Sequence, residues 1–321
     1  QDGSTSKNDW RGLHNLDEIV HSYNPASAWI QNCNSTPFTV SGSSSPIKSN
    51  YPVYMAPDGE NFRDLNAVRL FSNTTKMDLN DLIHLGYDRR LTAFELLIPA
   101  LTKAYDAQPR PELKALVDTL SAWNYEADVN SIAQHIAIRW ANVLLPNIPK
   151  IKQFGGETDP VINFKRFAAN ASPEVLLNSL AQVKASIEQQ FGRWNVTWGE
   201  VNRFQRIANT QPAVFDDSKP SISVPFTSSA WGQLPSYTSR SVQGSKKWYG
   251  INGNSFVAAV EFGKRLNAKT IITGGQSRFA DSKNFTDQAN GFIHGDFKTI
   301  HYYKEDVLAN KKLAYHPGLE R

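Results

Sequence analysis

The strongest pattern in the sequence is a helical repeat of apolar positions that begins near residue 78 and continues to residue 192. Within residues 94–105, apolar side chains recur at i, i+3, i+4, i+7 and i+11, which is the spacing of one face of a helix. Apolar residues within 132–143 mark a second helix, which Pro146 stops because proline has no backbone N–H to donate.

A third helix has signals at both of its ends. Ser172 can cap it, and Pro173 suits its first turn because the fixed φ of proline is already helical. An apolar stripe then runs through residues 176–191. Gly192 follows the stripe and is placed to end the helix in the left-handed conformation, which glycine adopts at little cost.

The segments on either side of these helices differ from them in composition and in apolar pattern. The first 60 residues are rich in Asn, Ser, Gly and Pro, and short apolar stretches at 28–30 and 51–54 predict strands or extended chain. After residue 215, stretches 255–262 and 269–273 are typical of strands, and a Gly-rich turn is expected at 251–254.

This order predicts an α+β fold with a helical insertion. We expect one structural unit of three segments. Residues 1–77 form a first sheet-forming segment, 78–214 a helical region, and 215–321 a C-terminal sheet-forming segment.

Composition and charge exclude several function classes. Hydrophobic residues make up 40% and charged residues 20% of the chain, which is ordinary for a globular protein. No apolar run reaches the roughly 18 residues of a membrane-spanning helix. The 34 Lys and Arg against 30 Asp and Glu are scattered, whereas a nucleic-acid binder concentrates its positive charge. We therefore expect neither a membrane nor a nucleic acid as partner.

Common catalytic and metal-binding motifs are absent from the sequence. The seven histidines form no HxxxH or HExxH pair, and a lone Cys33 cannot build a disulfide or a thiolate metal site. There is no phosphate-binding GxxxxGK[ST] or GxGxxG pattern, and no GxSxG nucleophile elbow.

Residues 29–38 are the densest candidate for chemistry. Two amides, Asn32 and Asn34, follow a predicted strand. An Asn side chain held by packing can aim its NH₂ donor at a developing oxyanion. The alternative is an Asx-turn, in which the side chain only satisfies nearby backbone. These residues alone are compatible with either interpretation, an oxyanion donor or an Asx-turn.

Residues 29–38 also resemble the stretch "GW(I/L)QNxN(D/S)xP" of the penicillin acylase family. Further stretches resemble that family in the same order along the chain: 63–70 with 76–78, 194–203, 274–288 and 304–307. Two positions depart from the family pattern, since Asn202 and Asn284 stand where the motifs have His. Those positions are not catalytic in the family, so the departures bear on local packing and subfamily and leave the implied fold and reaction class unchanged. Together the matching stretches cover nearly the whole chain.

The resemblance implies an N-terminal nucleophile hydrolase with a four-layer αββα sandwich, here only partly present. In this family a precursor cuts itself into α and β chains, and a Ser at the start of the β chain attacks amides with its own α-amino group as base. The chain resembles the C-terminal part of a β subunit, so that Ser is not in it. Ser4 and Thr5 lie near the N-terminus but do not match the nucleophile.

Two residues match catalytic positions of the family. Asn34 matches the oxyanion-hole Asn, and Arg63 matches the Arg that orients it. Trp29 and Asn32 are expected to support them, whereas Trp194 and Trp198 are expected to pack in the interior. The mechanism requires no cofactor. A calcium site occurs in some members of the family, and its ligands have no identifiable counterparts here.

The resemblance implies a periplasmic or secreted amidohydrolase that releases an acid and an amine from an N-acyl amide. Penicillins, acyl-homoserine lactones and related amides are all candidate substrates. The implied partners are the N-terminal part of the β subunit and the α subunit. One alternative is a non-catalytic module that binds acylated ligands or another chain, and a weaker one is a glycan-binding protein.

Overall fold

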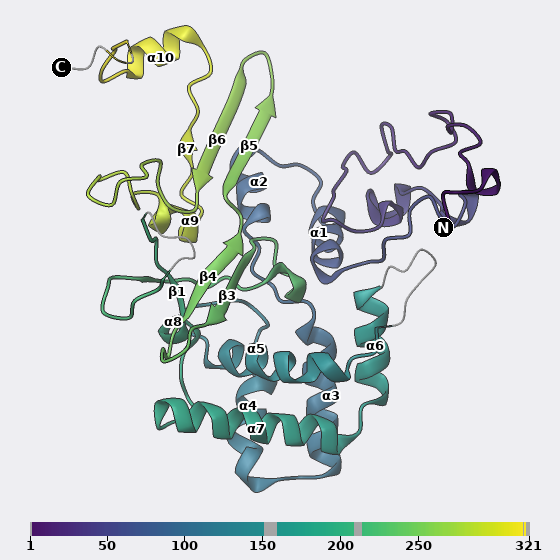
Figure 1. Ribbon diagram of the computed structural model, residues 1–321, viewed down its shortest axis with the longest axis vertical. Coiled ribbons are helices and arrows are strands. Elements are labelled where there is room, and N and C mark those ends of the chain that lie inside the picture. The colour runs from purple at the N-terminus through teal and green to yellow at the C-terminus, as the bar shows by residue number, and fades with distance from the viewer. Residues whose placement is uncertain (1, 151–158, 209–213, 317, 319–321) are drawn as a thin grey trace.

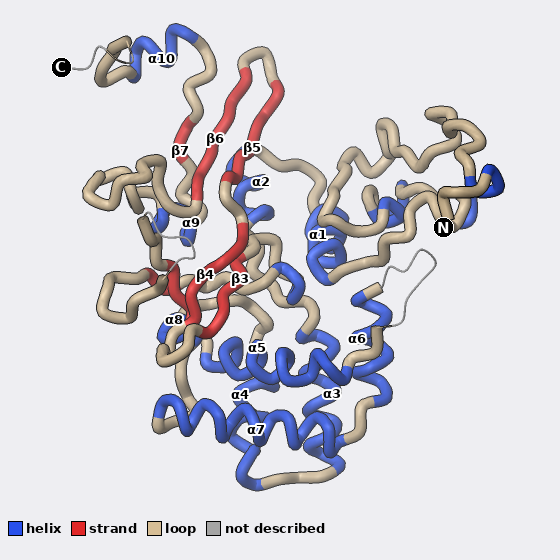
Figure 2. Tube along the Cα trace, viewed as in Figure 1, coloured by secondary structure: helices blue, strands red, loops and turns tan. Residues whose placement is uncertain are grey.

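The computed structural model describes residues 2–150, 159–208, 214–316 and 318, and its architecture is mixed α+β (Figures 1 and 2). The helices are α1 (Phe62–Ser72), α2 (Leu79–Gly86), α3 (Phe94–Ala107), α4 (Lys114–Ser121), α5 (Ile132–Leu144), α6 (Pro160–Asn170), α7 (Pro173–Phe191), α8 (Trp198–Val201), α9 (Ala289–His294) and α10 (Lys304–Asn310). The strands are β1 (Asn202–Phe204), β2 (Ile222–Ser223), β3 (Tyr237–Ser241), β4 (Trp248–Gly253), β5 (Phe256–Phe262), β6 (Leu266–Ile272) and β7 (Lys298–Thr299). Among the described helices, none combines the length and the apolar character needed to cross a membrane.

The three helices predicted from periodicity are confirmed as α3, α5 and α7. In α7 the Ser172 hydroxyl accepts the Val175 N–H at 3.4 Å, and Gly192 ends the helix with a φ of 75°. A side chain at that φ would be strained, so glycine is required there. Pro146 lies in a short 3₁₀ turn, Leu145–Asn147, that follows α5 directly.

The helices pack into one layer around the main apolar core. In Figure 1, α3 to α7 occupy the lower part of the molecule, and α7 lies against both α3 and α5. Trp140 of α5 is completely buried, and its indole N–H donates to the Ser179 hydroxyl of α7 at 2.8 Å. The polar end of this large side chain is thus satisfied inside the core.

The strands form two sheets, with orders β2-β1-β4-β3 and β5-β6-β7. All neighbouring strands are antiparallel except β1 and β4, which are parallel. The strands predicted at 255–262 and 269–273 are confirmed as β5 and β6.

The expected Gly-rich turn at 251–254 is wrong, because β4 continues to Gly253 and pairs with β3. Close approach between these strands explains the glycines. A Cβ at Gly250 would lie 2.2 Å from the Tyr237 ring, and one at Gly253 would lie 2.3 Å from the Ser236 carbonyl oxygen. Glycine here admits a neighbouring strand instead of making a turn.

No strand occurs in residues 2–77, the described part of the segment expected to form a first sheet. Residues 28–30 pair with no strand, and the chain turns at 52–55, where the Met55 N–H donates to the Pro52 carbonyl at 3.0 Å. Ser and Thr hydroxyls bind neighbouring backbone instead, as where Ser45 accepts the Ser41 N–H at 2.9 Å. Such local bonds compete with a strand ladder.

Apart from α1, this N-terminal segment lies away from the helical layer (Figure 1). None of residues 2–60 belongs to either buried apolar cluster. Several of its large apolar side chains are instead 81–89% exposed: Trp10, Leu13, Leu16 and Tyr23.

A buried histidine joins α5 to the segment before α8. The His135 Nδ1–H donates to the Val196 carbonyl at 2.9 Å, and its Nε2 accepts the Arg139 Nε–H at 2.8 Å. The second bond requires the neutral ring, because Nε2 can accept only when it carries no proton. Burial, reinforced by the Arg139 charge, lowers the pKa of His135 to about 3, so the ring stays neutral across the physiological range.

We predict that His135 makes the stability of the helical layer depend on pH. An unfolded histidine takes up a proton near pH 6.5, whereas the folded one resists protonation until about pH 3. The contribution of neutral His135 to the free energy of unfolding is therefore complete above pH 6.5 and is lost as the pH falls toward 3. At pH 4.5 the loss is about 2–3 kcal/mol, from roughly 1.4 kcal/mol per pH unit.

Urea unfolding of the native-type protein and of His135→Gln at pH 7 and pH 4.5 checks this. Gln keeps one donor and one acceptor but does not titrate, so the variant should lose about 2–3 kcal/mol less than the native-type protein between the two pH values. The surface variant His294→Gln is the control. Equal losses in His135→Gln and native-type protein would contradict the prediction.

Candidate functional site

The first turn of α1 is bound to the loop that carries Asn34. Asn61 caps the helix, because its Oδ1 accepts the Asp64 N–H at 2.9 Å. The other end of the same amide donates to the Cys33 carbonyl at 2.9 Å and to the Asn34 carbonyl at 3.3 Å. One side chain therefore both starts the helix and holds the loop.

Asn34 and Arg63 are brought into direct contact, as the resemblance implied. The Arg63 Nη2 group donates to the Cys33 carbonyl at 2.7 Å and to Asn34 Oδ1. Asn34 has a φ of 55°, a left-handed conformation that asparagine tolerates better than most residues, and its own N–H donates to Asn32 Oδ1 at 2.7 Å. The left-handed backbone and Arg63 together fix where the exposed amide lies.

The Arg63 contact also decides which end of the Asn34 amide is free. A guanidinium has only donors, so the atom facing it must be the carbonyl oxygen. The Nδ2 donor is left exposed, and no acceptor among the described residues engages it. The arrangement thus offers an oriented N–H donor at the surface of this chain.

Behind this pair, Asp64 is completely buried and accepts two further bonds from the loop. Thr39 Oγ1 donates to it at 2.9 Å, and the Gln31 amide donates to its other oxygen. Burial raises the pKa of Asp64, an effect that these donors oppose. An aromatic contact also joins this segment to α1, because Trp29 stacks on Phe71 with ring centroids 5.3 Å apart.

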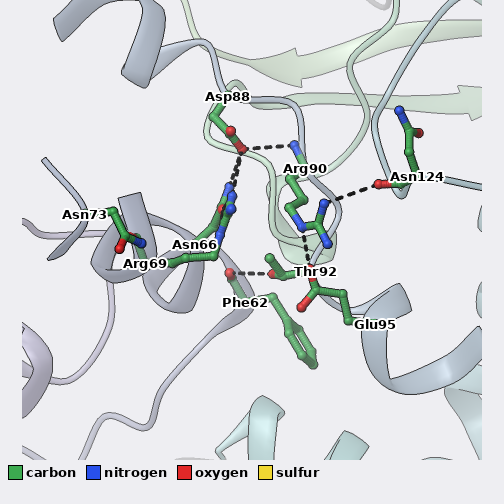
Figure 3. Close-up of polar contacts among 9 residues, drawn as sticks. All are labelled: Phe62, Asn66, Arg69, Asn73, Asp88, Arg90, Thr92, Glu95 and Asn124. Atoms are coloured by element: carbon green, nitrogen blue, oxygen red, sulfur yellow. Dashed lines mark hydrogen bonds and ion pairs between the residues drawn. The ribbon is translucent and has the colours of Figure 1, made fainter. Parts of the chain in front are cut away.

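The opposite side of α1 is held by a second polar network, drawn in Figure 3. Buried Asn66 donates to Asp88 at 2.7 Å and accepts from Arg69 at 2.6 Å. Thr92 Oγ1 donates to the Phe62 carbonyl at 2.9 Å. Because both networks bind the same helix, they fix the position of the Arg63 backbone relative to the Asn34 loop.

The remaining candidate residues lie either in the packed interior or on the surface. Trp198 is completely buried and Trp194 packs partly buried against the main core, as expected. Ser4 and Thr5 are exposed on the N-terminal segment. Burial raises the pKa of the Cys33 thiol, so it stays protonated at neutral pH and is a poor nucleophile.

Asn202 and Asn284, the two departures from the family motifs, differ in their surroundings. Asn202 is completely buried, and its amide donates to the Val224 and Phe226 carbonyls at 2.7 and 2.8 Å. Asn284 is exposed, and its carbonyl accepts the Ser277 N–H at 3.0 Å. Asn202 therefore holds local backbone through its side chain, whereas the Asn284 bond uses a backbone carbonyl that any residue would supply.

Sequence reasoning missed Asn61 and Asp64, which hold the site together. A detectable signal exists for Asn61, because an Asn three residues before an acidic residue is a common start of a helix. Nothing in the local sequence shows that Asp64 is buried against the Gln31 loop. In the part of the chain that the structure describes, no group of three or more His, Cys, Asp and Glu side chains is arranged to hold a metal ion.

The fold is similar to that of a solved structure titled "Thermostable Penicillin G acylase from Alcaligenes faecalis in orthorhombic form", with a TM-score of 0.55 and 16% sequence identity. The likeness covers 98% of this chain and 61% of that one. This chain therefore spans less than two thirds of the length of the penicillin acylase chain that it matches.

The family model described as "Penicillin amidase" matches residues 1–309. The chain therefore belongs to the penicillin amidase family, and the resemblance seen in its sequence motifs is confirmed.

We predict that the buried carboxylate of Asp64 is essential for the stability of the site. Asp64→Ala leaves the Gln31 amide without its acceptor and removes the shorter of the two hydrogen bonds of the Thr39 hydroxyl, which should lower the free energy of unfolding by roughly 2–4 kcal/mol. Chemical unfolding of the variant measures this. The exposed Asp58→Ala should change stability by less than about 0.5 kcal/mol. A similar loss in both variants would mean that the Asp64 contacts do not matter.

Proposed function

We propose that this chain is the C-terminal portion of the β subunit of a penicillin-acylase-like amidohydrolase that cleaves N-acyl amides. Family membership supports amide hydrolysis as the activity of the whole protein. The 61% coverage of the matched acylase chain supports the assignment to part of a longer protein. The observation that carries the proposal is the Arg63 contact to Asn34 Oδ1, which leaves an exposed Nδ2 donor.

In the proposed reaction, the hydroxyl oxygen of a Ser at the start of the β chain adds to the amide carbonyl carbon. The α-amino group of that Ser takes its proton and passes it to the leaving amine. Asn34 Nδ2 donates to the negative oxygen of the tetrahedral intermediate, and Arg63 holds the amide in the donating orientation. Water then cleaves the acyl ester and releases the carboxylic acid.

We further propose that the rest of the β subunit and the α subunit cover the N-terminal segment. The four exposed side chains Trp10, Leu13, Leu16 and Tyr23 form the kind of apolar surface that a partner buries. The two sheets would then be parts of an αββα sandwich whose other strands come from the missing portion. The protein is proposed to act in the periplasm or outside the cell, on penicillins, acyl-homoserine lactones or related amides.

Replacing the proposed oxyanion donor tests the function. In the complete, autoprocessed protein, Asn34→Ala should lower kcat by roughly 10²–10³ with little change in KM, because the donor acts on the transition state. Turnover of penicillin G and of N-octanoyl-homoserine lactone is the measurement. Asn170→Ala, on the exposed end of α6, is the control and should retain native-type turnover. A loss of less than about threefold in Asn34→Ala would remove its assigned role.

A double-mutant cycle tests the positioning role of Arg63. Arg63→Gln should lower kcat/KM by at least about tenfold, since the Asn34 amide is then free to rotate. In the Asn34→Ala background the same substitution should have little further effect, because the group that it orients is gone. Additive losses would show that Arg63 acts on the reaction by another route.

A further inference from the structure

Arg139 on α5 is a half-buried cation whose described partners are all neutral. Its Nε–H donates to His135 at 2.8 Å and its Nη2 donates to Gln190 Oε1 at 2.7 Å. Its guanidinium lies 5.2 Å from the centre of the Trp248 ring. None of the ion pairs among the described residues includes it.

The charge of Arg139 is therefore not compensated within the described chain. His135 is neutral, as its hydrogen bonds require. Burial lowers the pKa of Arg139 only to about 10, so the guanidinium remains charged at neutral pH. A partly desolvated cation without a counter-charge is costly, and an anion that reached it would relieve that cost. The bonds to His135 and Gln190 use two of its five N–H donors, and a guanidinium suits a carboxylate in particular.

An anion has room to reach Arg139. A cavity of about 200 Å³ lies between α5, α7 and Trp248, and its polar lining includes Arg139, Asn142, Gln182 and Ser186. It shares Asn142 and Trp248 with a second cavity of about 300 Å³. The second cavity is largely apolar, with a lining that includes Phe62, Ile138, Phe164, Trp198 and Trp231.

The apolar cavity is bounded by two packed aromatic rings. Trp198 is completely buried, and its indole N–H, which has no acceptor among the described residues, is covered by protein. Trp198 packs against Trp248 with ring centroids 6.0 Å apart, and Arg139 lies over the same Trp248 ring. A ligand spanning both cavities would meet a cation at one end and apolar walls along the rest.

We propose that these two cavities form a binding site for a small amphipathic carboxylic acid, separate from Asn34 and Arg63. The carboxylate binds Arg139, and the hydrocarbon part fills the cavity beyond Trp248. The site follows from the charge and the volume of this region and does not rest on the proposed amidase activity.

Binding to the complete protein, measured by isothermal titration calorimetry with octanoate and octan-1-ol, tests the role of Arg139. Octanoate should bind at least tenfold more tightly than the alcohol, because a charge-assisted hydrogen bond is stronger than a neutral one. Arg139→Gln should weaken octanoate at least tenfold and octan-1-ol less than twofold. The control Arg110→Gln, on a partly buried arginine that donates to Asn178 and lines neither cavity, should bind both as the native-type protein does.

A second variant keeps the test decisive if Arg139→Gln does not fold. Ser186 is exposed on α7 and lines the smaller cavity, so Ser186→Phe should obstruct it without removing the charge. That variant should also weaken octanoate at least tenfold. Equal affinity for octanoate and octan-1-ol, or unchanged octanoate binding in Ser186→Phe, would overturn the proposal.

Arg63→Gln distinguishes the proposed site from the Asn34 site. If octanoate binding is lost in Arg63→Gln and kept in Arg139→Gln, the acid occupies the Asn34 site and the proposed second site does not exist.

Discussion

The candidate site depends on the hydrogen bonds that hold the first turn of α1 against the Asn34 loop. A loop with little regular structure cannot by itself hold a side chain to the precision that an oxyanion requires. Here the loop is tied to a rigid helix through Asn61 and Arg63 on its surface and through buried Asp64 behind them. The helix is in turn held on its other side by Asn66 and Asp88. The donor is therefore positioned by a chain of bonds that reaches the helical layer.

Buried polar groups in this protein are arranged in two contrasting ways. Around Asp64 a carboxylate collects donors from the loop, which makes the local structure specific at the cost of desolvating the charge. Around Arg139 the partners are neutral and the charge is left without a counter-ion among the described residues. Asp64 is completely buried among its donors, whereas Arg139 lines a cavity. Access from a cavity, more than burial or the missing counter-charge, separates a binding site from a structural cluster.

The N-terminal segment and the helical layer differ in where their apolar side chains lie. Several large apolar side chains of the N-terminal segment are exposed, and its backbone is satisfied by local turns instead of strands. The helical layer, in contrast, has a core of its own, built around side chains such as Trp140. The chain thus combines a region that forms its own interior with one that leaves large apolar side chains exposed.

Sequence periodicity alone determined α3, α5, α7, β5 and β6, because those patterns repeat within one or two turns or along one strand. The motifs further implied that Asn34 and Arg63 meet, and they do. Tertiary structure decided what depends on distant neighbours. Gly250 serves strand approach because Tyr237 lies against it, and Asp64 is buried because a loop more than 20 residues earlier covers it. Local composition cannot reveal such contacts, since each partner becomes a neighbour only after the chain has folded.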